Sequence, residues 1–139
     1  MTALEVAEKC AQIMWKNDRA SRDLGFNLVK VSPGYAEMTL LIDEKHLNGH
    51  SICHGGLIFT LADSAFAFAC NTYNVSTVAH NNSITFIRPA FLRQKLTARA
   101  CEVDKTGRSG IYDVSVTNDS NQVIARFRGH SRAIKGTHF

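Results

Sequence analysis

The sequence predicts an α+β domain in which an antiparallel sheet of about six strands wraps around a central buried helix. Three observations carry this prediction. An apolar run at 55–70 has the length and composition of a buried helix, strand-like segments lie on both sides of it, and short turn sequences join those segments. Because the 139 residues contain no linker, repeat or low-complexity stretch, a single domain over 1–139 is the simplest organisation.

An additional N-terminal helix is expected first, ending before Ser21. Apolar residues recur there at helical spacing, at Leu4, Ala7, Cys10, Ala11 and Met14. Charged residues such as Glu5 and Glu8 interrupt them, so the segment lacks the continuous apolar core of a secretory signal. No apolar run in the chain approaches the ~20 residues that span a bilayer, so we expect no membrane segment.

Six segments show the alternation or the branched residues that are typical of strands. They are 26–31, 35–42, 83–88, 95–103, 111–117 and 123–134. The turn sequence Ser32-Pro33-Gly34 predicts a hairpin between the first two segments, and Lys105-Thr106-Gly107 marks a later turn. Connections this short favour antiparallel pairing.

Cysteine usage and charge limit the function classes. The four cysteines, at 10, 53, 70 and 101, form no CxxC pair and match no zinc spacing, which favours reduced thiols and a cytoplasmic location. The net charge of +4 suits nucleic acid, a membrane surface or a phosphate-bearing small molecule, but it can equally serve solubility alone.

Asp63 is the first candidate for chemistry. It lies near the middle of the segment GGLIFTLADSAFAFAC at 55–70, which is apolar nearly all round and therefore predicts a helix inside the protein. A buried carboxylate is costly unless it is paired, hydrogen-bonded or protonated, and such groups are enriched at functional sites. The alternatives are a structural aspartate that bonds a nearby backbone or hydroxyl group, and a helix face that is in contact with water.

His54-Gly55-Gly56 precedes the same helix. Backbone N–H groups at a helix N-terminus favour negative charge and can polarise a carbonyl, although a Gly-Gly pair also serves a tight turn or close packing. His46, His50 and His54 are spaced by four, but Asn48-Gly49 interrupts them and no carboxylate completes a site. We therefore expect no metal site.

The last strand carries a basic stripe. Arg126, Arg128, His130 and Arg132 alternate and so project to one face of the sheet, where they suit phosphates such as those of coenzyme A, or simply face solvent. A nucleic-acid surface would have exposed aromatic residues between the basic ones, and Phe127 instead alternates to the other face. We expect no nucleic-acid partner.

Four segments resemble one known family. The segment LNGHSICHGGLIFTLADSAFAFACN at 47–71 resembles the signature of hotdog-fold thioesterases, most of all those of phenylacetic acid degradation. The resemblance extends over nearly the whole chain through SITFIRPA at 83–90, IYDVSV at 111–116 and RFRGHSR at 126–132. It implies the hotdog fold and hydrolysis of aryl-acetyl-CoA thioesters in a homotetramer built from dimers.

The resemblance also implies roles for individual residues. Asp63 corresponds to the catalytic carboxylate, acting as nucleophile or as general base, and the Gly55 N–H to the donor that polarises the thioester carbonyl. Asn48 and His54 match positions that orient substrate or water. Some relatives have a serine where this chain has Ala79. The residues predicted to bind substrate are Gly56, Ser64, Arg88, Arg126 and Arg128.

A geometric argument places the predicted site between two chains. Gly55 and Asp63 are eight residues apart, which corresponds to about 12 Å along a helix. The carbonyl-polarising donor and the attacking group must both lie ~3 Å from the reacting atoms. Two antiparallel helices across a twofold axis satisfy that requirement, each placing its Asp63 beside the Gly55 of the other.

The predicted function is therefore hydrolysis of phenylacetyl-CoA or a ring-hydroxylated analogue. Coenzyme A is part of the substrate, and no separate cofactor is expected. The alternatives are a non-catalytic acyl-CoA-binding or regulatory module and a thioesterase for other aryl or fatty acyl-CoA esters. A hydratase of the same fold is disfavoured, because such chemistry commonly uses a histidine in the buried helix and none lies between Gly55 and Ala79.

Overall fold

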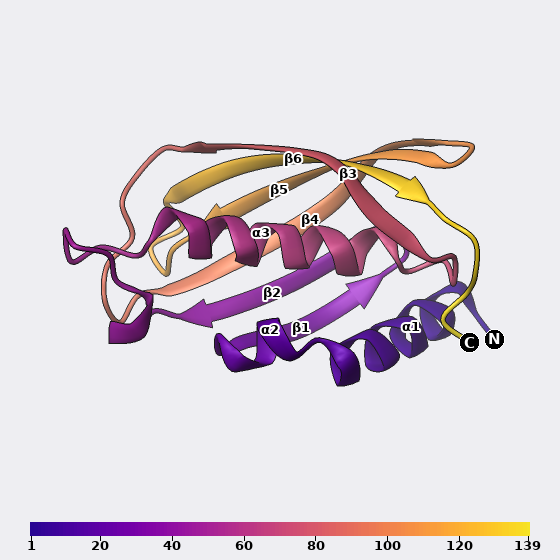
Figure 1. Ribbon diagram of the computed structural model, residues 1–139, viewed down its shortest axis with the longest axis horizontal. Helices are drawn as coiled ribbons and strands as arrows, with labels where there is room; N and C mark the ends of the chain where they lie inside the picture. Colours follow the sequence, from indigo (N-terminus) through magenta and orange to yellow (C-terminus); the bar gives the residue numbers. More distant parts are fainter.

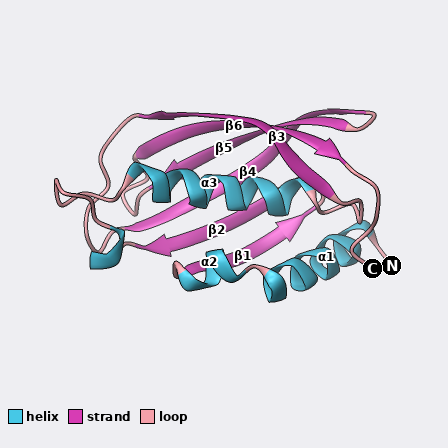
Figure 2. Ribbon diagram, viewed as in Figure 1, coloured by secondary structure: helices cyan, strands magenta, loops and turns pink.

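A six-stranded antiparallel sheet wraps around helix α3 (Gly55–Cys70) in the computed structural model, which describes residues 1–139 (Figures 1 and 2). The strand order is β1-β2-β4-β5-β6-β3, so β1 and β3 form the two edges. The strands are β1 (Phe26–Ser32), β2 (Tyr35–Leu41), β3 (Thr77–Phe86), β4 (Lys95–Thr106), β5 (Ser109–Thr117) and β6 (Val123–Ala133). The predicted α+β arrangement, a sheet around one buried helix with an extra N-terminal helix, is confirmed.

The N-terminal helical region consists of two helices instead of one. Helix α1 (Ala3–Asn17) ends before Ser21 as predicted, but α2 (Arg19–Asp23) follows at once and includes Ser21. Asp18 separates them and caps α2, because its carboxylate accepts the Ser21 N–H at 3.0 Å. Helix α1 packs beside β1, and the Trp15 ring lies 6.2 Å from the Phe68 ring of α3. No helix of the structure combines the length and the apolar character needed to cross a membrane.

One predicted strand was placed too late in the chain. Of the segment predicted at 83–88, residues 83–86 form the second part of β3, which begins at Thr77 and ends at Phe86, and residues 87–88 lie beyond the strand. The sequence TVAHNN at 77–82 lacks the branched apolar run of a typical strand, and asparagine is depleted in strands. Because β3 is an edge strand with mostly exposed side chains, its pairing with β6 holds it in place without such a run.

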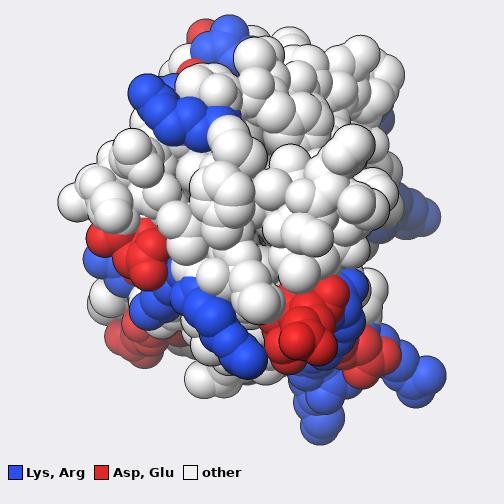
Figure 3. All heavy atoms as spheres, turned by 90° about the vertical axis from the view of Figure 1, so that its left-hand side faces the viewer, with Lys and Arg blue, Asp and Glu red and all other residues white.

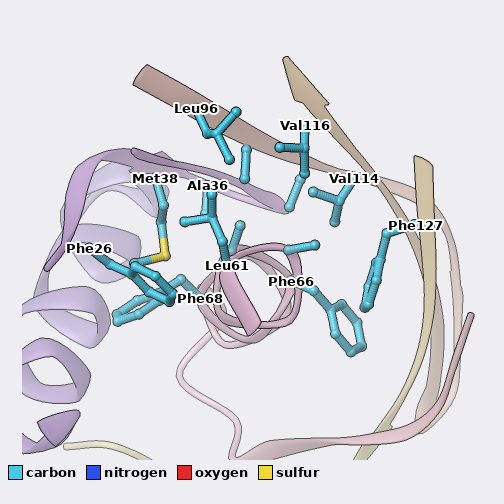
Figure 4. Packing of buried hydrophobic residues seen from close by; sticks show 14 of the residues in the cluster. Phe26, Ala36, Met38, Leu61, Phe66, Phe68, Leu96, Val114, Val116 and Phe127 are labelled. Carbon is cyan, nitrogen blue, oxygen red and sulfur yellow. The ribbon is translucent and has the colours of Figure 1, made fainter. Parts of the chain in front are cut away.

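Helix α3 is held by apolar contacts on most of its surface. Leu61, Phe66 and Phe68 are buried against residues of several strands, including Met38, Leu96, Val114, Val116 and Phe127 (Figure 4). Each fully buried side chain of this size contributes about 1.5–3 kcal/mol relative to an exposed one. This packing fixes the helix within the curve of the sheet and so fixes the direction in which its few polar side chains point.

Gly129 on β6 leaves space for the Phe66 ring of α3. The Phe66 ring lies 5.8 Å from the Phe127 ring and 5.6 Å from the Tyr112 ring. A Cβ added at Gly129 would lie 2.7 Å from the Phe66 ring, closer than real Cβ atoms come to a neighbour. The absence of a side chain at Gly129 is therefore what allows α3 to approach β6.

We predict that Gly129→Ala lowers the free energy of unfolding by about 1–3 kcal/mol, the usual cost of overpacking a well-filled core. Urea denaturation monitored by the single tryptophan measures the change. Gly49→Ala is the matched control, because a Cβ there meets nothing within 4 Å. Equal destabilisation by the two substitutions would contradict this account of the packing.

Candidate active site

Asp63 lies on the side of α3 that faces strand β3. Asn82 sits opposite Gly129 in the β3–β6 register, so its side chain points toward the helix. Its Nδ2 donates a hydrogen bond of 2.8 Å to Oδ1 of Asp63. The half-buried carboxylate is thus bonded by one side-chain amide, rather than by the backbone or hydroxyl partner of the structural alternative.

The environment of Asp63 changes its acidity in two opposing directions. Burial among apolar groups raises the pKa of the carboxyl, and the hydrogen bond from Asn82 lowers it, with burial the larger effect. A carboxylate that has lost much of its hydration and keeps one hydrogen bond is a stronger base and nucleophile than one in water. Asn82 was missed by the sequence analysis because the segment that carries it does not resemble a strand.

The N-terminus of α3 offers one free backbone donor. His54 caps the helix, and its Nδ1 accepts the Gly56 N–H at 2.9 Å. The Gly55 N–H has no acceptor within the chain. Of the two glycines predicted to contact substrate, Gly55 therefore has the available donor, while the donor of Gly56 is already bonded.

Gly55 borders a hollow of about 320 Å³ that also includes Asn48, Ile52, Phe86 and Arg88. Oδ1 of Asn48 accepts the N–H groups of His50 and Ile52, so this side chain shapes the loop before the helix. The Arg88 guanidinium donates to the Val123 carbonyl oxygen at 2.8 Å. The structure thus brings together the predicted residues Asn48, Gly55 and Arg88.

The hollow lies at an end of the molecule that is largely uncharged. Figure 3 shows this end of the molecule from the left-hand side of Figure 1. Neutral residues form most of the centre of this face, and charged side chains lie mainly toward its edges. Exposed apolar side chains belong to the segments that meet here: Leu41, Phe86, Ile87, Phe91 and Leu92. Such a surface suits an apolar group of a ligand or of a second chain.

The Phe86 ring packs closely against the backbone at Gly55. A Cβ at position 55 would lie 3.1 Å from Cζ of the Phe86 ring. Asn82 and Phe86 project from the same face of β3, about 13 Å apart at the usual rise per strand residue. Asp63 and Gly55, which lie against them, are separated by about 12 Å along α3. Within one chain, therefore, the carboxylate and the free N–H donor are not brought together.

Comparison with known proteins assigns this arrangement to a family. The sequence model of the thioesterase superfamily matches residues 50–125. The acyl-coenzyme A thioesterase PaaI of Escherichia coli is 39% identical over 127 residues, which cover 91% of each chain. The chain belongs to the thioesterase superfamily. The predictions of this family and of a thioester hydrolase are thereby confirmed.

Solved structures agree with that assignment and with the predicted hotdog fold. The Escherichia coli PaaI protein, from the phenylacetic acid degradation operon, superposes with a TM-score of 0.96 at 38% identity, covering 98% of this chain and 99% of its own. A mutant form of the phenylacetic acid degradation protein PaaI from Thermus thermophilus gives 0.81 at 32%, covering 84% and 100%. A Streptococcus mutans protein bound to acetyl-CoA gives 0.77 at 26%, covering 81% and 90%.

The basic stripe of this thioesterase lies on the outer face of the sheet, away from α3. Arg128 makes two hydrogen bonds to the Asp113 carboxylate, at 2.6 and 2.8 Å, and thereby lowers the pKa of that carboxyl. Arg126, its neighbour on the same face, makes no ion pair. The structure thus separates these two residues from the hollow beside Gly55.

Two further candidate residues, Ser64 and His46, form hydrogen bonds within the chain. Ser64, next to Asp63 on α3, lies with its hydroxyl 3.0 Å from that of Ser21 on α2. His46 is buried, with Nδ1 accepting the Asp43 N–H and Nε2 bonded to the Leu24 carbonyl oxygen. The chain contains no group of three histidine, cysteine or acidic side chains placed to hold a metal ion.

We predict that Asp63→Asn is more stable than the wild type at pH 7. The folded-state pKa of Asp63 is raised, so ionising this group costs stability above that pKa, and the cost disappears as the pH falls to the unfolded value of about 4. Urea denaturation at pH 7 and pH 4 measures the difference, which should shrink on acidification. Asp119→Asn, at an exposed position, serves as the control. If Asp63→Asn were less stable than the wild type at pH 7, the conclusion that burial raises the pKa of Asp63 would be contradicted.

Proposed function

We propose that the chain hydrolyses the thioester of phenylacetyl-CoA, or of a ring-hydroxylated phenylacetyl-CoA, to the free acid and coenzyme A. The observation that carries the proposal is the desolvated Asp63 carboxylate, held by one amide on the buried helix of a thioesterase-superfamily fold. The similarity to a thioesterase from a phenylacetic acid degradation operon supports the aryl-acetyl group.

Asp63 acts in its charged form as nucleophile or general base. As a base it takes a proton from water while the water oxygen bonds to the thioester carbon, and it then returns that proton to the departing CoA sulfur. As a nucleophile it forms an acyl-enzyme anhydride that water cleaves. In both cases negative charge develops on the carbonyl oxygen, and the free Gly55 N–H at the N-terminus of α3 stabilises it.

The complete site is formed by two chains. Strand β3 has an unpaired edge, and its antiparallel pairing with the same edge of a second copy would extend the sheet about a twofold axis. The two α3 helices then run antiparallel, with each Asp63 beside the Gly55 of the other chain. Asn48 and His54, which lie close to Gly55 in sequence and structure, orient substrate or water in that shared site. The homotetramer stays a prediction.

Coenzyme A is bound through its phosphates by basic residues. Of the two arginines on the outer face of β6, Arg126 is the one whose charge is not paired, because Arg128 is engaged by Asp113. Arg88 lies at the hollow beside Gly55 and can contact the part of the ligand nearest the thioester. The roles of Gly56 and Ser64 in binding substrate stay predictions.

Thiol release from a set of acyl-CoA esters tests the proposal. We predict turnover of phenylacetyl-CoA with a higher kcat/KM than of long-chain fatty acyl-CoA. Asp63→Asn should reduce kcat by about 10²–10⁴-fold, since the carboxamide is a poor base and a poor nucleophile. The control is Asp119→Asn. Binding of phenylacetyl-CoA without any thiol release by the wild type would instead indicate an acyl-CoA-binding module.

A matched pair of substitutions tests the donor at residue 55. Gly55→Pro removes the N–H, and proline is tolerated at the first helical position after a residue with the extended backbone that His54 has, with φ −61° and ψ 130°. Gly55→Ala adds the same Cβ beside Phe86 but keeps the N–H. We predict that kcat falls at least ~10²-fold more in Gly55→Pro than in Gly55→Ala. Equal losses in both would remove the backbone donor from the mechanism.

A further inference from the structure

The side-chain oxygen of Asn82 has no hydrogen-bond partner in the chain. Its Nδ2 is bonded to Asp63, but its Oδ1 is the only buried side-chain nitrogen or oxygen in the chain without a hydrogen-bond partner. A buried acceptor without a donor is unfavourable, and its persistence calls for a specific reason.

The side chains beside Asn82 on the sheet do not supply a donor for its Oδ1. Its neighbours on the same face of β3 are Ile84 and Phe86, and it faces Gly129 on β6, so no side chain beside it on the sheet supplies a donor. An apolar side chain of the same size would fill the space without leaving an unpaired oxygen. The Oδ1 acceptor near the Asp63 carboxylate therefore has no donor within the chain and can take one from a molecule that enters the site.

We propose that Asn82 is a further catalytic residue, whose Nδ2 fixes the Asp63 carboxylate and whose Oδ1 accepts a hydrogen bond from the attacking water. The inference rests on the proposed thioesterase function and deepens it. It assigns to Asp63 the role of general base, because a carboxylate attacking directly would need no second acceptor next to it.

The chemistry requires two acceptors that face one water molecule. One water hydrogen is directed to the free oxygen of Asp63 and the other to Oδ1 of Asn82, so the oxygen lone pair is directed at the thioester carbon. As the C–O bond forms, the first proton passes to Asp63 and the carbonyl π electrons move to the carbonyl oxygen. Collapse of this intermediate breaks the C–S bond, and the proton on Asp63 goes to sulfur. The second proton stays on the acid.

The surroundings leave Asn82 as the main polar influence on Asp63. Asp18, between α1 and α2, is bonded to Ser21. Cys70, later on α3, and Tyr112, on the inner face of β5, both have pKa values raised by burial and are neutral at pH 7. Histidines and arginines of β3 and β6 lie on the outer face, where His80 and His130 border one shallow hollow. The Asn82 hydrogen bond lowers the Asp63 pKa, so its loss should raise that pKa.

Substitutions at Asn82 test the inference through the rate and its pH dependence. In Asn82→Leu, which is similar in size, kcat for phenylacetyl-CoA should fall roughly 10²-fold with little change in KM, because the water is no longer oriented. The acid limb of the kcat–pH profile, where Asp63 gains its proton, should move to higher pH. Asn82→Asp keeps an acceptor but places a second carboxylate beside Asp63, and should move that limb further up.

Ser83→Ala is the matched control, because Ser83 is the next residue on β3 and projects to the outer face opposite Arg128. It should behave like the wild type. An active wild type with Asn82→Leu equal to it in kcat would overturn the role of Asn82 alone. A lower kcat with an unmoved acid limb would reduce Asn82 to a structural residue and also overturn it. A wild type without thioesterase activity would overturn the proposed function and this inference together.

Discussion

The packing of α3 against the inner face of β3 is the constraint on which the rest of the site depends. It places Asp63 against Asn82 at one point and Gly55 against Phe86 about two helical turns away. The apolar core around α3 fixes this geometry, and the glycine at 129 permits it by admitting the Phe66 ring. The same core removes water from Asp63 and so raises its pKa. Packing and reactivity thus share one cause.

The apolar packing around Asp63 also implies a conflict between stability and function. A desolvated carboxylate is more basic than a hydrated one, but its ionised form is held at a cost in folding free energy. The unpaired Oδ1 of Asn82 adds a second unfavourable feature at the same place. Two such features side by side in an otherwise satisfied interior are expected where the chain has been selected for a reaction rather than for stability.

Sequence alone was sufficient where periodicity and apolar content are strong. The boundaries of α3 agree with the apolar run, and Asp63 stands out as the one charge within it. It was insufficient for the first half of β3, because TVAHNN is stabilised as an edge strand by its pairing with β6, which no local pattern encodes. Asn82 was missed for the same reason. The outer-face position of Arg126 and Arg128 follows from alternation, but the Arg128–Asp113 pair depends on cross-strand register.

The central claim is that each thioester site uses Asp63 from one chain and the Gly55 N–H from another. Mixing inactive Asp63→Asn with inactive Gly55→Pro, after subunit exchange, tests it most directly. A heterodimer holds one site with both defects and one with neither, so activity should return to at most about half of the wild-type value per heterodimer. If mass spectrometry confirms exchange and thiol release from phenylacetyl-CoA stays absent, the shared site is contradicted.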